Sequence, residues 1–134
     1  IIMPVNVEGA LLSLGDLHAK QGAGELLGCA VECDGRVTIS VEVIKGTDPS
    51  WFGWPQVNTR EFIGSLGYRD NSIEQSVKEA VYDMMKRLET DYGLTYMEAY
   101  MLVGQCVNIE ICQMLGQACG VLATIDRKIL DQIV

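Results

Sequence analysis

Strong positive charge, long hydrophobic runs and paired cysteine motifs are all missing from this 134-residue sequence. Ten Lys and Arg residues against 18 Asp and Glu give a net charge of −8, whereas nucleic-acid binding relies on clustered basic side chains. No apolar run approaches the roughly 18 residues that would cross a bilayer. These absences argue against a nucleic-acid or membrane partner, and we expect a cytoplasmic protein.

The five cysteines do not have the spacing of a disulfide framework or a zinc knuckle. Their number is odd and no Cys-x-x-Cys pair occurs. Small buried thiols are therefore the expected role. Cys29 and Cys33 lie four residues apart on a predicted strand, which leaves a shared metal ion as an alternative interpretation.

The composition predicts one folded unit. With 49% hydrophobic residues the chain can bury a core, and no repeat or low-complexity segment divides it. The opening Ile1-Ile2-Met3-Pro4 lies within an apolar stretch, as expected of a strand cut from a longer chain. We expect residues 1–134 to form a single α+β unit, either complete or part of something larger.

The first third of the chain predicts antiparallel β structure. Residues 8–13 form a short apolar stretch, and residues 26–33 and 36–45 flank Asp34-Gly35, a strong hairpin signal. In the second of these predicted strands valine and isoleucine alternate with polar residues, so one face should be buried.

Residues 46–55 predict a loop, because two Gly, two Pro, an Asp and a Ser fall within it. The loop also carries Trp51 and Trp54. We interpret these aromatic residues as a lid folded over a core; the alternative is that they form a pocket wall or a subunit contact. Two short strands, over residues 56–61 and 62–68, should follow the loop.

Two helices are predicted in the middle of the chain. Ser72 has Gln75 three residues later, which predicts a capped helix that Gly93 then ends. Thr95 with Glu98 predicts the start of the second helix.

Two closing strands are predicted over residues 108–115 and 120–130. The order of strands, helices and strands is typical of an α+β architecture. We therefore predict an N-terminal antiparallel hairpin, two central helices and two C-terminal strands.

The residues best suited to chemistry lie between Gly15 and Glu25. This segment gathers the only histidine, two carboxylates, a lysine and a glutamine around three glycines. On an extended backbone Asp16 and His18 point to the same side, where both could bind one divalent cation. A catalytic zinc needs a third protein ligand, which must come from elsewhere. The alternative is a local hydrogen-bonded turn without a metal.

Glu25 follows the glycine-rich turn of this segment. We interpret it as a general acid/base that accepts a proton from water and passes it to a leaving amine. Gly22 and Gly24 permit a left-handed backbone, and their amides could approach an oxyanion; the alternative is an ordinary turn. Lys20 is expected to be a solvated cation.

Residues 7–19 read VEGALLSLGDLHA, and Gln21-Gly22 and Gly24-Glu25 follow. This motif resembles the core motif of the acetamidase/formamidase family, and its length makes it specific. The similarity covers essentially the whole chain; further matching stretches are residues 28–32, 54–55, 65–68, 85–88 and 94–102 and Gln113.

The resemblance implies hydrolysis of the carbon–nitrogen bond in small linear amides such as formamide or acetamide, giving ammonia and a carboxylate. It also implies a bound divalent metal, with zinc as the first choice and calcium as the alternative, and a cytoplasmic homo-oligomer. By the same resemblance Asp16 and His18 fall on metal or active-site positions, His18 being a catalytic candidate as well. Glu25 falls on the glutamate of the family's glycine-rich loop.

The sequence also departs from the family pattern. The family usually has Asp in place of Ala23 and of Asn108. The chain resembles the C-terminal half of the longer family members, whose N-terminal half, absent from this sequence, supplies further His and Asp residues to the site. A non-catalytic fragment or assembly half of such an amidase is therefore the alternative function. A thiol amidase with Cys29 as nucleophile, and Glu25 and Lys20 as base and orienter, is a weaker alternative, because Cys29 lies in an apolar predicted strand.

Overall fold

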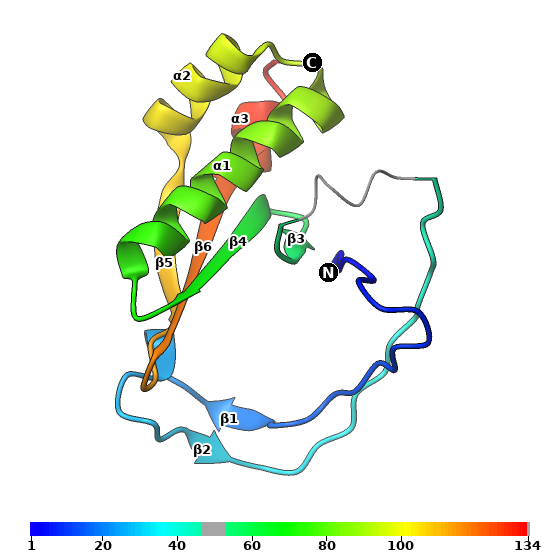
Figure 1. Ribbon diagram of the computed structural model, residues 1–134, viewed down its shortest axis with the longest axis vertical. Helices are drawn as coiled ribbons and strands as arrows, with labels where there is room; N and C mark the ends of the chain where they lie inside the picture. Colours follow the sequence, from blue (N-terminus) through cyan, green and yellow to red (C-terminus); the bar gives the residue numbers. More distant parts are fainter. Residues whose placement is uncertain (47–52, 134) are drawn as a thin grey trace.

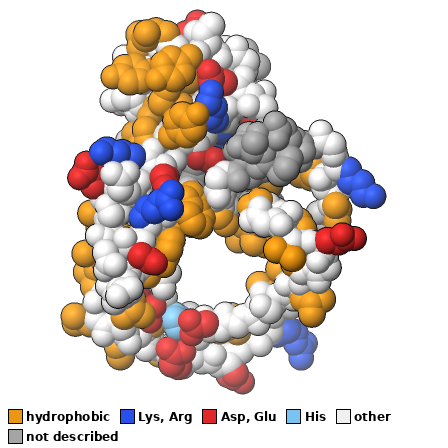
Figure 2. All heavy atoms as spheres, viewed as in Figure 1, with side chains coloured by type: hydrophobic (Ala, Val, Ile, Leu, Met, Phe, Trp, Pro, Cys, Tyr) orange, Lys and Arg blue, Asp and Glu red, His pale blue; other side chains and the backbone are white. Residues whose placement is uncertain are grey.

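The computed structural model describes residues 1–46 and 53–133, which form two visibly different parts (Figure 1). Residues 53–133 build a helix-covered sheet, whereas the first 46 residues run as an extended arc that includes a short two-stranded ribbon. Figure 2 shows an opening between this arc and the rest of the molecule. Across the described residues the antiparallel sheets and helices confirm the predicted α+β class.

The larger sheet contains four strands in the order β3-β4-β6-β5, and all neighbouring strands are antiparallel. The central strands β4 and β6 pair over their whole length, from Phe62 opposite Asp126 to Asp70 opposite Ala118. The predicted strands in this part of the chain are therefore confirmed, with shifted ends. Their bounds are β3 Gln56–Asn58, β4 Phe62–Asp70, β5 Asn108–Gln113 and β6 Ala118–Asp126.

The last predicted strand is too long. The observed strand β6 ends at Asp126, because its partner β4 begins at Phe62. The chain then turns into the short helix α3 (Arg127–Leu130). The backbone N–H of Arg127 donates to the carbonyl of Glu61, which directs the chain away from the sheet. This turn buries Leu130 in the core.

Both central helices are confirmed, as α1 (Ile73–Tyr92) and α2 (Tyr96–Cys106). Ser72 Oγ accepts a hydrogen bond from the backbone N–H of Gln75, and Gly93 ends α1 with a φ of 67°. Thr95 and Glu98 form a complete capping box at the start of α2. These local contacts satisfy backbone groups that a helix end would otherwise leave unpaired.

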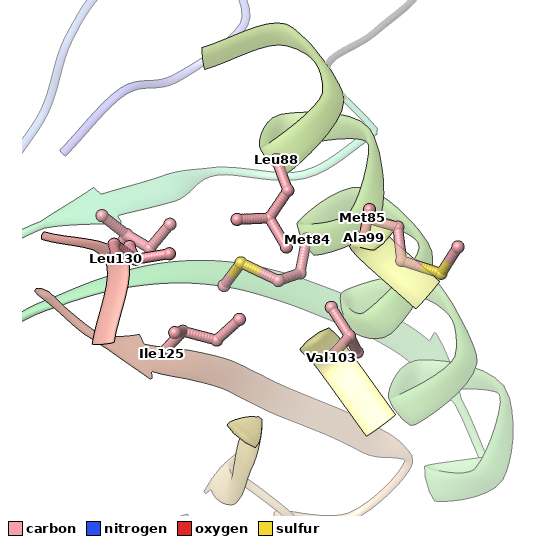
Figure 3. Close-up of a cluster of buried hydrophobic side chains, with 8 residues drawn as sticks. Met84, Met85, Leu88, Ala99, Val103, Ile125 and Leu130 are labelled. Atoms are coloured by element: carbon pink, nitrogen blue, oxygen red, sulfur yellow. The ribbon is translucent and has the colours of Figure 1, made fainter. Parts of the chain in front are cut away.

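Helix α1 covers one face of the sheet and buries the main core (Figures 1 and 3). Figure 3 shows Met84 and Leu88 of α1 lying against Ile125 and Leu130. The rest of this cluster is Ile63, Met85, Ala99 and Val103. Alternate residues of β6 pack against α1 side chains, as the period of a strand requires; they are Val121, Ala123 and Ile125.

Gly67 marks a close approach between α1 and β4. A Cβ at this position would overlap the carbonyl oxygen of Ser76 and lie 2.6 Å from the backbone nitrogen of Ala80. Ser76 is fully buried, and its hydroxyl donates to the carbonyl of Cys119 at 2.6 Å. The helix therefore rests directly on the backbone of the sheet here.

Arg87 joins α1 to β3 and β4 from within the core. Its side chain is only 2% exposed, and Nη1 donates to the carbonyls of Val57 and Gly64 at 3.3 and 2.9 Å. Nη2 donates to Asn58 Oδ1, and Nε donates to Asp91 Oδ2 at 3.3 Å. A buried guanidinium is tolerated because these acceptors replace water.

Asp83, one turn earlier on α1, is a buried carboxyl that accepts a 2.8 Å hydrogen bond from Gln56 Nε2. Burial raises the pKa of Asp83, and the hydrogen bond from Gln56 opposes this effect only in part. The folded state binds the proton of the Asp83 carboxyl more tightly than the unfolded state does. The stabilising effect of this proton is fully present below the pKa that Asp83 has in the unfolded state. It is lost as the pH rises through the folded pKa.

We therefore expect the stability of Asp83→Asn to decline less with rising pH than that of the wild type. The measurement is the urea midpoint of both proteins at a series of pH values upward from about 4, near the unfolded pKa of Asp. Identical pH slopes for the two proteins would contradict the assignment.

The predicted strands of the N-terminal third are wrong in detail. Residues 8–13 contain a turn and no strand, and residues 26–33 and 36–45 do not pair across Asp34-Gly35. An antiparallel pair does form, but between β1 (His18–Lys20) and β2 (Val31–Glu32). The alternating apolar side chains of the predicted second strand are half or more exposed, so the burial that stabilises a hairpin is missing; they are Val37, Ile39, Val41 and Val43.

Within the part of the chain that the structure describes, no helix combines the length and the apolar character needed to cross a membrane.

Candidate metal and catalytic site

The β1–β2 ribbon brings one imidazole and two carboxylates together. His18 begins β1 and is the register partner of Glu32 in β2, while Asp16 lies just before β1. One ligand atom from each of the three residues falls within 4.8 Å of the others. In Figure 2 the histidine colour lies among acidic side chains on the lower arc.

His18 Nε2 faces both carboxylates. It lies 3.1 Å from Asp16 Oδ1 and 3.0 Å from Glu32 Oε1. The side chain of His18 is 10% exposed, whereas those of Asp16 and Glu32 are 82% and 70% exposed. Among the described residues none is oriented to hydrogen-bond Nε2, so this nitrogen points at the space between the carboxylates.

The surroundings of His18 attract positive charge. The hydrogen bond with Gln21 raises the pKa of His18 above its ordinary value, and the carboxylates of Glu32 and Asp16 add to this effect against the opposing desolvation. A proton satisfies this arrangement, and so does a divalent cation, since imidazole nitrogen and carboxylate oxygen are the ligands that zinc accepts. The residues present therefore fit a metal ion.

The sequence predicted Asp16 and His18 as ligands but missed Glu32. Glu32 is far from both in sequence, and only the pairing of β1 with β2 brings its carboxylate to the ring. The signal that could have found it is an acidic residue at the end of an otherwise apolar predicted strand. A carboxylate there needs a partner or water.

Glu25 closes the glycine-rich turn next to this cluster. It ends the short 3-10 helix η1 (Ala23–Glu25), is half-buried, and lies close enough for its charge to raise the pKa of His18. Its φ of 47° is left-handed, as is the 58° of Asp16. These are two of the three described non-glycine residues with positive φ. Such strained conformations concentrate at functional sites.

The turn is anchored on the end of β5. Gly24 is buried with a φ of 76°, and its carbonyl accepts a 2.7 Å hydrogen bond from the backbone N–H of Met114. A Cβ at Gly24 would lie 3.1 Å from Ile111 Cγ2. Gly22 begins the turn, and its carbonyl accepts from the N–H of Glu25 at 3.1 Å. Both glycines thus shape the turn, and their oxyanion role stays a prediction.

An open hollow of about 310 Å³ lies between the turn and β5. Its walls come from Gln21 to Gly24 on one side and from Glu110, Ile111 and Cys112 on the other. Burial raises the pKa of the Cys112 thiol, which keeps it protonated and a poor nucleophile.

For the other cysteines, the prediction of small buried thiols is confirmed only in part. Cys119 is buried as expected, but Cys29 and Cys33 are exposed, and Cys29 lies outside any strand. The objection that Cys29 sits in an apolar strand is therefore wrong. In the described part of the chain neither cysteine joins the cluster of metal-ligand atoms.

Trp54 lies on the helix-covered sheet rather than in the histidine loop. Its Nε1 donates to Glu79 Oε2 at 2.7 Å, and its ring centroid lies 5.6 Å from that of Tyr68. Glu79 also accepts from Arg69 Nε at 2.5 Å. Trp51 lies outside the described residues, and the pocket role of both tryptophans stays a prediction.

Comparison with known proteins identifies relatives of the whole chain. The Acetamidase/Formamidase family model matches residues 1–131. An acetamidase of Mycolicibacterium smegmatis is 53% identical over 47 residues, covering 34% of this chain and 12% of the relative.

Two solved acetamidases share the fold. One from Bacillus halodurans aligns with a TM-score of 0.83 and 29% identity, over 97% of this chain and 43% of that one. One from Yersinia enterocolitica aligns with a TM-score of 0.76 and 33% identity, over 84% of this chain and 33% of that one. This chain thus spans less than half the length of these relatives. Since the family match runs almost from end to end and the folds agree, the chain belongs to the acetamidase/formamidase family.

Proposed function

We propose that this chain carries a metal-binding and catalytic loop for the hydrolysis of small linear amides such as formamide and acetamide. The observation that supports this most is the convergence of Asp16, His18 and Glu32 around a ring nitrogen with no hydrogen-bond partner among the described residues. The names of the solved relatives support the amide as the substrate class.

Asp16, His18 and Glu32 would hold the ion, which we propose to be zinc, with calcium as the alternative because two of the three donors are carboxylates. When bound, such an ion polarises a carbonyl and makes water a stronger acid. Three ligands from the described residues would leave positions for water and substrate.

Other residues of the chain would complete the chemistry. Glu25 would accept the proton of the attacking water and pass it to the leaving amine, so that amide and water give a carboxylate and ammonia. The hollow between the turn and β5 would seat the amide, since about 310 Å³ exceeds what so small a molecule needs. The amides of Gly22 and Gly24 would stabilise the developing oxyanion.

Removing a ligand should weaken metal binding by the purified chain. We expect stoichiometric zinc in the wild type, and an affinity at least about 10-fold lower in His18→Ala, Asp16→Asn and Glu32→Gln. Calorimetric titration and elemental analysis measure this directly. Asp34→Asn, an exposed carboxylate on the same arc, is the matched control and should bind like the wild type.

Equal zinc affinity in Glu32→Gln and the wild type would remove Glu32 from the site. A chain that takes up no metal, and that releases no ammonia from formamide or acetamide, would favour the alternative function of a non-catalytic assembly half. The homo-oligomeric state and the cytoplasmic location stay predictions; sizing of the purified chain tests the former.

A further inference from the structure

Gln21 contacts the ring nitrogen of His18 that faces away from the carboxylates. Its side-chain oxygen Oε1 lies 2.6 Å from His18 Nδ1. With the carboxamide oxygen of Gln21 facing the ring, Gln21 can only accept there, and this arrangement assigns the hydrogen to Nδ1. In a neutral imidazole the other nitrogen, Nε2, is then an acceptor with its lone pair directed between Asp16 and Glu32.

We infer that Gln21 is a positioning residue that fixes the tautomer of His18 and so keeps Nε2 available for a cation. The inference rests on the proposed function for its purpose, but the tautomer itself can be tested without metal or substrate. Metal-binding histidines characteristically donate their second N–H to an oxygen acceptor, and losing that acceptor weakens metal binding by about 10- to 100-fold.

The alternative tautomer would block the site. Free histidine favours the proton on Nε2, and in this loop Nε2 lies 3.1 and 3.0 Å from two carboxylate oxygens. Among the described residues, Nδ1 has a hydrogen-bond acceptor in Gln21 Oε1, whereas Nε2 makes no hydrogen bond of good geometry. The charge of the two carboxylates attracts a proton to Nε2, so the hydrogen bond to Gln21 is the described contact that favours the tautomer able to bind metal.

Local geometry makes Gln21 suited to this role. It follows β1 by one residue and stands three positions after His18, at the entrance of the glycine turn. It also lines the hollow beside that turn. The same side chain therefore connects the ring of His18 to the wall of the proposed substrate site.

The test uses the chain's single histidine. Labelling with 15N-histidine gives the signals of one imidazole, and at a pH where the ring is neutral they report which nitrogen carries the hydrogen. We expect the Nδ1–H form in the wild type and a change to Nε2–H in Gln21→Met, which keeps the side-chain volume without a carbonyl acceptor. Gln21→Glu should restore Nδ1–H, because a carboxylate can only accept. Lys20→Met, an exposed neighbour, is the control and should match the wild type.

Zinc titration of the same four proteins provides the second readout. We expect Gln21→Met to bind about 10- to 100-fold more weakly and Gln21→Glu to recover the affinity. The Nε2–H form in the wild type, or an unchanged tautomer in Gln21→Met, would overturn the inference. If the tautomers change as expected but no protein binds zinc, the role of Gln21 stands and the metal site fails. If zinc binds equally with and without Gln21, the inference fails and the metal site stands.

Discussion

Replacing Gly67 by alanine should strongly destabilise the helix-covered sheet. The new Cβ would overlap the carbonyl oxygen of Ser76 and approach the backbone nitrogen of Ala80 to 2.6 Å. These obstructing atoms are helix backbone, which cannot rotate away as a flexible side chain can. Helix α1 would have to lift from β4 and β6, which separates Ala80 from Val121 and Ala123.

Gly67→Ala should lower the free energy of unfolding by about 3 kcal/mol or more, which is the upper end for overpacked cores. The total stability of a domain is about 5–15 kcal/mol, so this loss is large. The measurement is denaturant unfolding followed by circular dichroism. Gly104→Ala in α2 is the matched control, because beyond its own chain neighbours and nearby helix backbone no described atom lies within 4 Å of the new Cβ. The free energy of unfolding of Gly104→Ala should rise by about 0.5–1 kcal/mol, because alanine has a higher helix propensity than glycine. A stable, wild-type-like Gly67→Ala would show that α1 does not rest on the sheet here.

Replacing Glu25 should abolish amide hydrolysis without loss of metal. A general acid/base contributes about 100- to 10,000-fold to rate, so Glu25→Gln should lose turnover by that factor. Glu25→Gly should lose as much activity yet gain about 0.5–1 kcal/mol of stability, because glycine relieves the left-handed backbone at a φ of 47°.

Ammonia release measures the activity, and zinc titration and urea unfolding measure the other two properties. The preparation is this chain, or a longer protein that contains it, in a form that turns over formamide or acetamide. Asp34→Asn, an exposed carboxylate of the arc, should leave all three unchanged. Retained turnover in Glu25→Gln would exclude Glu25 as the proton carrier.

Sequence alone could predict the elements whose signals are local. The two helices follow from capping residues and a terminal glycine, which act within a few residues of where they stand. By contrast, Asp34-Gly35 predicts a hairpin only where the flanking apolar face can be buried. Here that face is exposed and β2 pairs with β1 instead.

The site was predictable only in part, again because sequence signals act over a few neighbouring residues. Asp16, His18 and Glu25 lie in one short segment, so the motif itself identifies them. Glu32 enters through strand pairing, which the local pattern does not specify. The buried Arg87 and Asp83 were missed because their partners on β3 and β4 are defined only once the helix packs on the sheet.

The extended segment of residues 36–45 has a consequence for handling the protein. It combines alternating Val and Ile side chains with an exposed backbone that belongs to no strand, which is the signature of a segment that adds to strands of other molecules. Arg36, Glu42 and Lys45 interrupt this stretch with charge and oppose such stacking. Aggregation of the isolated chain should therefore begin in this segment, and neutralising its charges should hasten it.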